Sequence, residues 1–306
     1  MPASAYFVGS AVFHYLGPSF AVLLFARVEP LGVAWLRIAS AALIFAAWRR
    51  PWRLLRSRLL FAWGLVLAAM NCCFYLAIDR LPLGTVAAIE FVPVIVLAAV
   101  GARTARNFGA LALAVPGVYL LTDVRLSGEP LGVAFAFANA ILFALYIVLA
   151  HRASRQPKGV GSFFATPETG VAKKDLTPID GLAAAMLIAA VVATPLAGWD
   201  AVPALDDPVA LAAGVGVGVT SSVIPYVCDQ LAMARLARST YALMVSLLPA
   251  TATVIGVIVL GQVPSWIEVA GVSLVVGGVA LHREPAEAEP EPVEEEAEPD
   301  ARVLAA

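Results

Sequence analysis

Two residues of opposite charge stand inside long apolar stretches of the sequence, where a charge is costly in a membrane. Arg37 follows Pro30 by seven residues, and Glu90 follows Gly84 by six. At a rise of about 1.5 Å per residue, both would lie roughly 10 Å below the same membrane surface. Opposite charges at one depth can pair. The pair would be either a permanent salt bridge, or a site where Arg37 binds a substrate carboxylate or Glu90 binds a proton or an ammonium group.

Other polar residues in apolar stretches extend this candidate set for binding a substrate or a proton. Asp229 would serve such a site or reach the aqueous phase from the end of its helix. Asn71 and Asn139 would serve it or hold helices together. His14 could titrate near neutral pH or simply be bonded inside the bundle. Five hydroxyl-bearing residues near two of the prolines are expected to line the same cavity: Ser221, Ser222, Tyr226, Ser246 and Thr251.

Several prolines fall inside the apolar stretches, where each removes one backbone hydrogen-bond donor. In a membrane, the carbonyls freed in this way are tolerated only beside protein or a water-filled cavity. We therefore interpret these prolines as candidate gating kinks, with kinks that have no function as the alternative. The candidates are Pro18, which follows Gly17, and Pro93, Pro225 and Pro249.

The composition places these residues in lipid. Hydrophobic residues make up 61% of the chain and charged residues 14%, against about 45–50% and about 25% in soluble globular domains. The three cysteines form no CxxC pair. The sequence also contains no HExxH zinc motif and no phosphate-binding P-loop. We therefore expect no cofactor, no metal site, no nucleic-acid partner and no enzymatic activity.

The apolar stretches predict an all-α polytopic membrane protein. A spanning helix requires about 20 predominantly apolar residues, and this criterion predicts about ten helices. Their expected ranges are 6–26, 30–48, 59–78, 84–102, 108–122, 130–150, 179–198, 209–234, 240–261 and 264–282.

Lysine and arginine are distributed unevenly over the connections between these stretches. Alternate connections carry 15 basic residues on one side and 3 on the other. Because basic residues concentrate in cytoplasmic loops, the first side should be cytoplasmic, and both termini with it.

An internal repeat suggests how the ten helices are organised. Residues 71–85 match residues 226–240 at six positions, including a cysteine, an arginine and a threonine. The copies are five helices apart, and an odd offset turns them to face opposite sides of the membrane. Transporters use such inverted repeats to exchange outward-open and inward-open states.

The repeat divides the chain into two five-helix halves. The first half would span 6–122 and the second 130–283, with a cytoplasmic linker at 152–178. Residues 284–306 are rich in proline, alanine and glutamate and contain no aromatic residue. Such a segment cannot bury enough apolar surface to fold, so a disordered acidic tail is expected.

Several short segments carry a family resemblance over the whole membrane part. Among them are Glu-Pro-Leu-Gly before Arg37, Arg-Leu-Pro-Leu-Gly-Thr before Glu90, and Ser-Ser-Val-Ile-Pro-Tyr at 221–226. The chain resembles the EamA-type drug/metabolite transporters, and within them the threonine/homoserine exporter branch. The resemblance implies two five-helix repeats in a multi-pass protein of the bacterial plasma (inner) membrane. It also places Asp229 at a position that is commonly acidic in that branch.

Together these features predict a secondary active transporter. It would export a small metabolite, an amino acid or an analogue, by alternating access coupled to protons. A membrane channel or a lipid scramblase is the alternative, although neither requires inverted symmetry, and a membrane-embedded enzyme fits less well. The expected partners are the lipid bilayer and a small-molecule substrate, with a homodimer as a further possibility.

Overall fold

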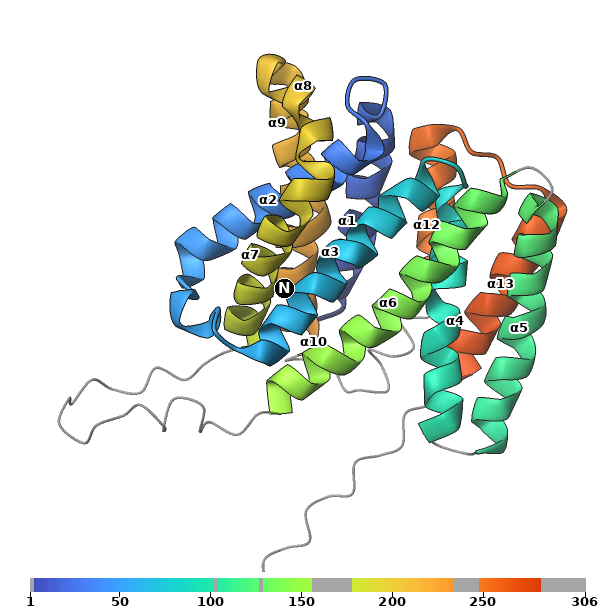
Figure 1. Ribbon diagram of the computed structural model, residues 1–306. Coiled ribbons are helices and arrows are strands. Elements are labelled where there is room, and N and C mark those ends of the chain that lie inside the picture. The colour runs from blue at the N-terminus through green and yellow to red at the C-terminus, as the bar shows by residue number, and fades with distance from the viewer. Residues whose placement is uncertain (1–2, 102–103, 127–128, 156–177, 234–247, 282–306) are drawn as a thin grey trace, which may run out of the picture.

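The computed structural model describes residues 3–101, 104–126, 129–155, 178–233 and 248–281, and every regular element in these ranges is helical (Figure 1). Most of the linker expected at 152–178 lies outside these ranges. The acidic tail and Ser246 also lie outside the described residues.

The first half of the chain forms five long helices. A short 3-10 turn, η1 (Trp52–Leu54), precedes the third of them. The five are α1 (Ala3–Leu24), α2 (Pro30–Arg49), α3 (Arg58–Ile78), α4 (Leu83–Gly101) and α5 (Ala105–Leu126).

The second half contains more breaks. Its elements are α6 (Pro130–Arg155), α7 (Pro178–Ala197), η2 (Trp199–Ala201), α8 (Val202–Asp206), α9 (Pro208–Gly218), η3 (Val219–Val223), α10 (Ile224–Met233), α12 (Leu248–Leu260) and α13 (Trp266–Leu281). The stretch expected as one helix at 209–234 is α9 and α10 joined through η3, which is a π-helix. Neither this π-helix nor the short α8 was expected.

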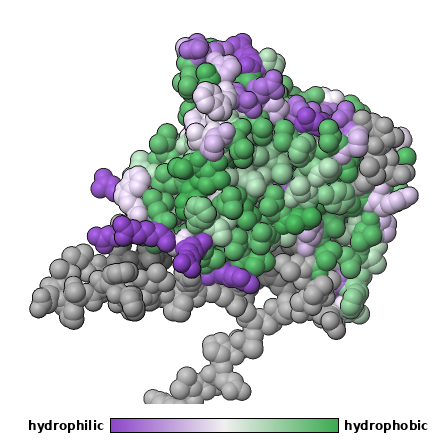
Figure 2. All heavy atoms as spheres, viewed as in Figure 1, coloured by the Kyte–Doolittle hydropathy of each residue, from purple (hydrophilic) through white to green (hydrophobic). Residues whose placement is uncertain are grey.

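The described helices have the length and composition of a polytopic membrane protein. Within the described residues, five segments are long and apolar enough to cross a membrane, namely Pro30–Arg49, Arg58–Ile78, Pro130–Ala150, Ile179–Ala197 and Pro208–Cys228. Shorter apolar helices lie in the other expected ranges. Figure 2 shows apolar side chains over the middle of the visible face, with hydrophilic side chains gathered above and below them.

The helices pack in a pattern that repeats along the chain. In the first half α3 packs against α6 and α7, and α4 packs against α6. The helices five further along the chain make the equivalent contacts when α9, η3 and α10 are counted as one span. That span packs against α1 and α2, and α12 packs against α1. Three further contacts, α2 with α7, α4 with α12 and α5 with α13, each join two helices five apart (Figure 1).

An ion pair lies at each end of the bundle. At the end where α2 begins, Arg27 Nη1 lies 2.9 Å from Asp207 Oδ2, in the connection that precedes α9. At the end where α2 finishes, Arg49 and Asp180 form two hydrogen bonds of 2.8 and 3.1 Å, which join α2 to α7. If successive helices run in alternate directions, the two connections joined by each ion pair lie at the same end of the bundle.

Candidate functional site

The first part of the site is formed around Pro225, which interrupts a helical span of the second half. Pro225 has no backbone N–H, so the carbonyl of Ser221 loses its α-helical donor. The backbone here widens into η3, a kind of distortion that is frequent at functional sites. Arg37 of α2 takes the place of the missing donor. Its Nη2 donates to the Ser221 carbonyl at 3.1 Å, and its Nε donates to Ser222 Oγ at 3.0 Å.

A tyrosine from α3 completes the surroundings of this arginine. The Arg37 guanidinium carbon lies 5.7 Å from the centre of the Tyr75 ring, within cation–π range. Tyr75 and Ser221 are fully buried. The Tyr75 hydroxyl interacts with Ser221 and Arg37, but no hydrogen bond of full geometry reaches Tyr75 Oη or Ser221 Oγ. The fold therefore leaves two buried hydroxyl groups unsatisfied beside a buried guanidinium.

The acidic candidate belongs to a second polar contact. Asn139 of α6 donates from Nδ2 to Glu90 Oε1 of α4 at 3.1 Å. Asn139 is fully buried, and its Oδ1 is likewise without a partner. Asn139 thus joins α4 and α6, which is the helix-holding role that was one of its two expected roles. Its partner in this contact is Glu90.

The ion pair expected between Arg37 and Glu90 is not formed. Arg37 bonds to η3 and Glu90 bonds to Asn139, although the two charges remain within range of an electrostatic interaction. The reason is geometric: the carbonyl freed by Pro225 accepts a hydrogen bond from the guanidinium, which therefore points to η3 and not to Glu90. Two charged groups in the apolar bundle are consequently held by neutral partners.

Helix α1, from the first half of the chain, packs against η3 and α10 in this region. Ser10 Oγ donates to the Pro225 carbonyl at 3.3 Å and lies 3.4 Å from His14 Nδ1. The His14 ring also meets the Tyr226 ring edge-on, with 6.0 Å between centroids. Further along α1, Gly17 packs so closely on Ser221 that any side chain there would overlap it. The residue after it, Pro18, is buried within α1.

Four further candidates lie on described helices. Asn71 is buried and donates from Nδ2 to the Leu67 carbonyl of its own helix at 2.8 Å. Asp229 lies on α10, and Pro93 and Pro249 lie in α4 and α12. Their roles, and those of Ser246 and Thr251, stay predictions.

Sequence reasoning missed the contributions of Tyr75 and Ser10, and it singled out Gly17 only together with Pro18, as a candidate gating kink. A spacing signal existed for the first two. Tyr75 stands four residues after Asn71, and Ser10 four before His14, so each shares a helix face with a residue that was singled out. Nothing in the sequence marked Gly17 as a contact of the π-helix.

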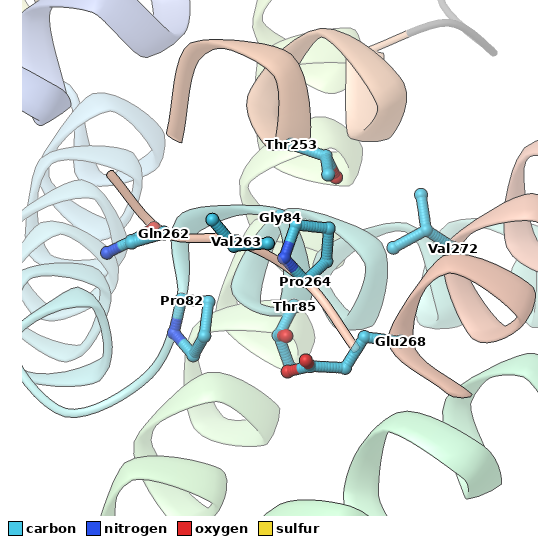
Figure 3. Close-up of a pocket in the computed structure, with 9 residues that line it drawn as sticks. All are labelled: Pro82, Gly84, Thr85, Thr253, Gln262, Val263, Pro264, Glu268 and Val272. Carbon is cyan, nitrogen blue, oxygen red and sulfur yellow. The ribbon is translucent and has the colours of Figure 1, made fainter. Parts of the chain in front are cut away.

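A separate cavity of about 200 Å³ opens between α4, α12 and α13 (Figure 3). The side chain of Gln262 accepts from Leu83 N at 3.0 Å through Oε1 and so caps the start of α4. Glu268 accepts from the amide and the hydroxyl of Ser265 at 2.9 and 3.0 Å, which caps the start of α13. These contacts stabilise helix ends, so we assign this cavity a structural role.

Comparison with known proteins places the chain in a family. It is 32% identical over 282 residues to the threonine/homoserine exporter RhtA of Salmonella typhimurium strain SL1344, covering 88% of each chain. The chain belongs to the EamA-like transporter family. The model of that family matches residues 162–283. RhtA of Escherichia coli strain K12 is also 32% identical, over 254 residues that cover 80% of this chain and 79% of that one.

A crystal structure of another protein shares the fold. The TM-score is 0.55 at 19% sequence identity, over 92% of this chain and 96% of that chain. The expected family resemblance is thus confirmed, and the chain is a multi-pass membrane protein whose relatives are exporters.

Proposed function

We propose that this chain is a secondary active transporter that exports threonine, homoserine or a related amino acid across the bacterial plasma membrane. The two relatives described above are named as threonine/homoserine exporters, and they match this chain over most of its length. The same proposal includes alternating access, proton coupling and a cytoplasmic location for both termini.

The observation that carries the proposal is the pair of charged groups inside the apolar bundle. Arg37 is held by Ser221, Ser222 and the Tyr75 ring, and Glu90 by Asn139. Ionisable residues in membrane spans usually mark a substrate or ion pathway. An amino acid carries one positive and one negative group, so a site with one acidic and one basic pole suits it.

Two features support an inverted repeat and therefore alternating access. The packing partners of the first-half helices recur five helices later, and three contacts join equivalent helices of the two halves. The described part of the sequence match, residues 71–78 against 226–233, falls on α3 and α10, which are equivalent helices in this arrangement. Two halves that can exchange their conformations would open the central site to each side in turn.

Glu90 is the proposed carrier of the coupling proton. Its carboxylate now accepts a hydrogen bond from a neutral amide on another helix. Protonation would turn one carboxyl oxygen into a donor and so change the contact with Asn139. Such a change at the boundary between α4 and α6 would link proton uptake to movement of the helices.

A counterflow assay tests the proposed function. Purified protein in liposomes preloaded with unlabelled L-threonine should take up labelled L-threonine faster than the same liposomes without a preload, because a carrier exchanges substrate. A channel would show no such acceleration. Uptake of L-threonine and L-homoserine no faster than into protein-free liposomes would refute the proposal.

The orientation has its own test. A reporter that is active only outside the cytoplasm should stay inactive when fused after Ala306, because the more basic connections are expected inside. Strong activity of this fusion, at normal abundance in the membrane, would reverse the proposed topology.

A further inference from the structure

The hydroxyl groups of Tyr75 and Ser221 lie beside each other and beside Arg37 without forming a hydrogen bond of full geometry in the described state. Both residues are fully buried. Buried polar groups are nearly always hydrogen-bonded, and an unsatisfied one destabilises the fold. Phenylalanine and alanine would fill the same space without that cost. The two hydroxyls therefore point to a partner that is absent from this state.

The surroundings of these hydroxyls define the chemistry of that partner. Arg37 can only donate hydrogen bonds, and η3 uses two of its five N–H groups. The hydroxyls of Tyr75 and Ser221, which lie close to each other, can both donate as well. A ligand group here must accept several hydrogen bonds and carry negative charge. An ammonium group is excluded, because it only donates and the guanidinium would repel it.

We propose that Arg37, Ser221 and Tyr75 form the subsite that binds the carboxylate of the transported substrate. A carboxylate has two oxygens that accept several hydrogen bonds, and it forms strong charge-assisted bonds with arginine. This inference rests on the proposed function for the identity of the ligand as a transported amino acid. The existence of an anion subsite rests on the three side chains alone.

The position of α1 explains how the subsite would be controlled. Gly17 lies directly against Ser221, so α1 closes this side of the subsite. On this side, a ligand would reach the Ser221 hydroxyl when α1 moves away from η3. The Arg37 N–H that donates to the Ser221 carbonyl belongs to the guanidinium that would bind the carboxylate. Carboxylate binding and the support of the broken helix would therefore draw on the same guanidinium.

Ligand-induced thermal stabilisation of the purified protein tests the subsite without relying on transport. L-threonine should raise the unfolding temperature, whereas L-threoninol, which has a hydroxymethyl group in place of the carboxylate, should not. Ser221→Ala and Tyr75→Phe should each need about tenfold more L-threonine for the same shift, because each removes one bond to a charged group. Without ligand, both variants should unfold at the same temperature as the wild type or higher.

Two substitutions serve as controls. Ser19→Ala removes a buried hydroxyl that bonds to the Tyr15 carbonyl of its own helix, and Tyr119→Phe removes an exposed one. Both should keep the response of the wild type to L-threonine. The proposal is overturned if L-threoninol stabilises the protein as well as L-threonine, if L-threonine gives no shift, or if the two site variants respond like the wild type. Loss of stability in step with loss of response would also reject it, in favour of a structural role.

The same preparations separate this inference from the proposed function. A protein that binds L-threonine through the carboxylate, yet does not move it across liposome membranes, refutes export and leaves the subsite standing. If L-threonine is transported and neither Ser221→Ala nor Tyr75→Phe changes that transport, export is supported and the proposed subsite is refuted.

Discussion

The contact between Gly17 and Ser221 offers the sharpest test of how α1 covers the site. A methyl group on Gly17 would lie 2.8 Å from Ser221 N and 2.9 Å from Ser221 Cα, in addition to overlapping the hydroxyl. Backbone atoms cannot rotate out of the way, so α1 or η3 must shift. Overpacking of this kind costs about 1–3 kcal/mol.

Gly17→Ala also raises the stability of the helix itself, and a control substitution can measure that effect. Alanine is favoured over glycine in a helix interior by about 1 kcal/mol. Gly9 lies on the same helix, and a methyl group there would meet nothing within 4 Å. Gly9→Ala should therefore stabilise the protein by up to about 1 kcal/mol. Gly17→Ala should give a net loss of between about 0 and 2 kcal/mol, once its gain is set against the cost of overpacking.

The assay is reversible unfolding in mixed micelles, with transport measured on the same preparations. The free energies of unfolding of the two variants should differ by about 1–3 kcal/mol, which is the overpacking cost alone. Transport should fall more in Gly17→Ala than its abundance does, because α1 no longer closes over Ser221. Adding Ser221→Ala should not restore stability fully, since the backbone contacts remain. Equal stability of Gly9→Ala and Gly17→Ala would refute the close packing of α1 on η3.

Three further predictions concern charged groups. Glu90→Gln should abolish the stimulation of L-threonine uptake by an imposed proton gradient, measured in proteoliposomes, while counterflow continues; unchanged stimulation would exclude Glu90 as the proton carrier. Arg37→Lys should raise the KM for L-threonine about tenfold, because an ammonium group lacks the planar fork that reaches two partners at once; an unaltered KM would contradict this role. Asp207 caps α9, and its pKa is lowered, first by the backbone N–H of Ala210 and next by Arg27. Its contribution to stability should therefore be complete above the unfolded-state pKa of about 3.9 and disappear as the pH falls through the lower folded-state value. The difference in unfolding temperature between the wild type and Asp207→Ala should follow that course, and a difference that grows in acid would contradict the assignment.

The helices could be predicted because their signal is local. A run of apolar residues of sufficient length specifies a spanning helix whatever it packs against. The interruption at Pro225 was also predictable, because the loss of a backbone donor follows from the residue type. The π-helix around it was not. Widening by one residue is a response of the backbone to its neighbours, and among them are Arg37 and Gly17 on two other helices.

The partners of Arg37 and Glu90 could not be predicted from the sequence, for a related reason. Rise per residue fixes the depth of Arg37 and Glu90 in a membrane, but rotation of each helix decides which side chain it faces. Tertiary packing sets that rotation, and here it directs Arg37 to η3 and Glu90 to Asn139. Tyr75 was missed because an aromatic residue in an apolar run is usually part of the packed interior. Its unsatisfied hydroxyl becomes informative only when its neighbours are known.

The arrangement around Arg37 is difficult to explain by stability alone. A regular helix without Pro225 would supply the missing donor to the Ser221 carbonyl from its own backbone. An apolar residue at position 37 would then avoid the burial of a charge, and such replacements of buried ionic groups are often neutral or stabilising. The protein instead combines a proline, a π-helix, a buried guanidinium and two unsatisfied hydroxyls within one contact. Local strain of this kind persists where the surrounding fold supports it and tends to cluster at functional sites. A guanidinium that supports a broken helix can also leave it for a carboxylate, which an intact helix would not allow.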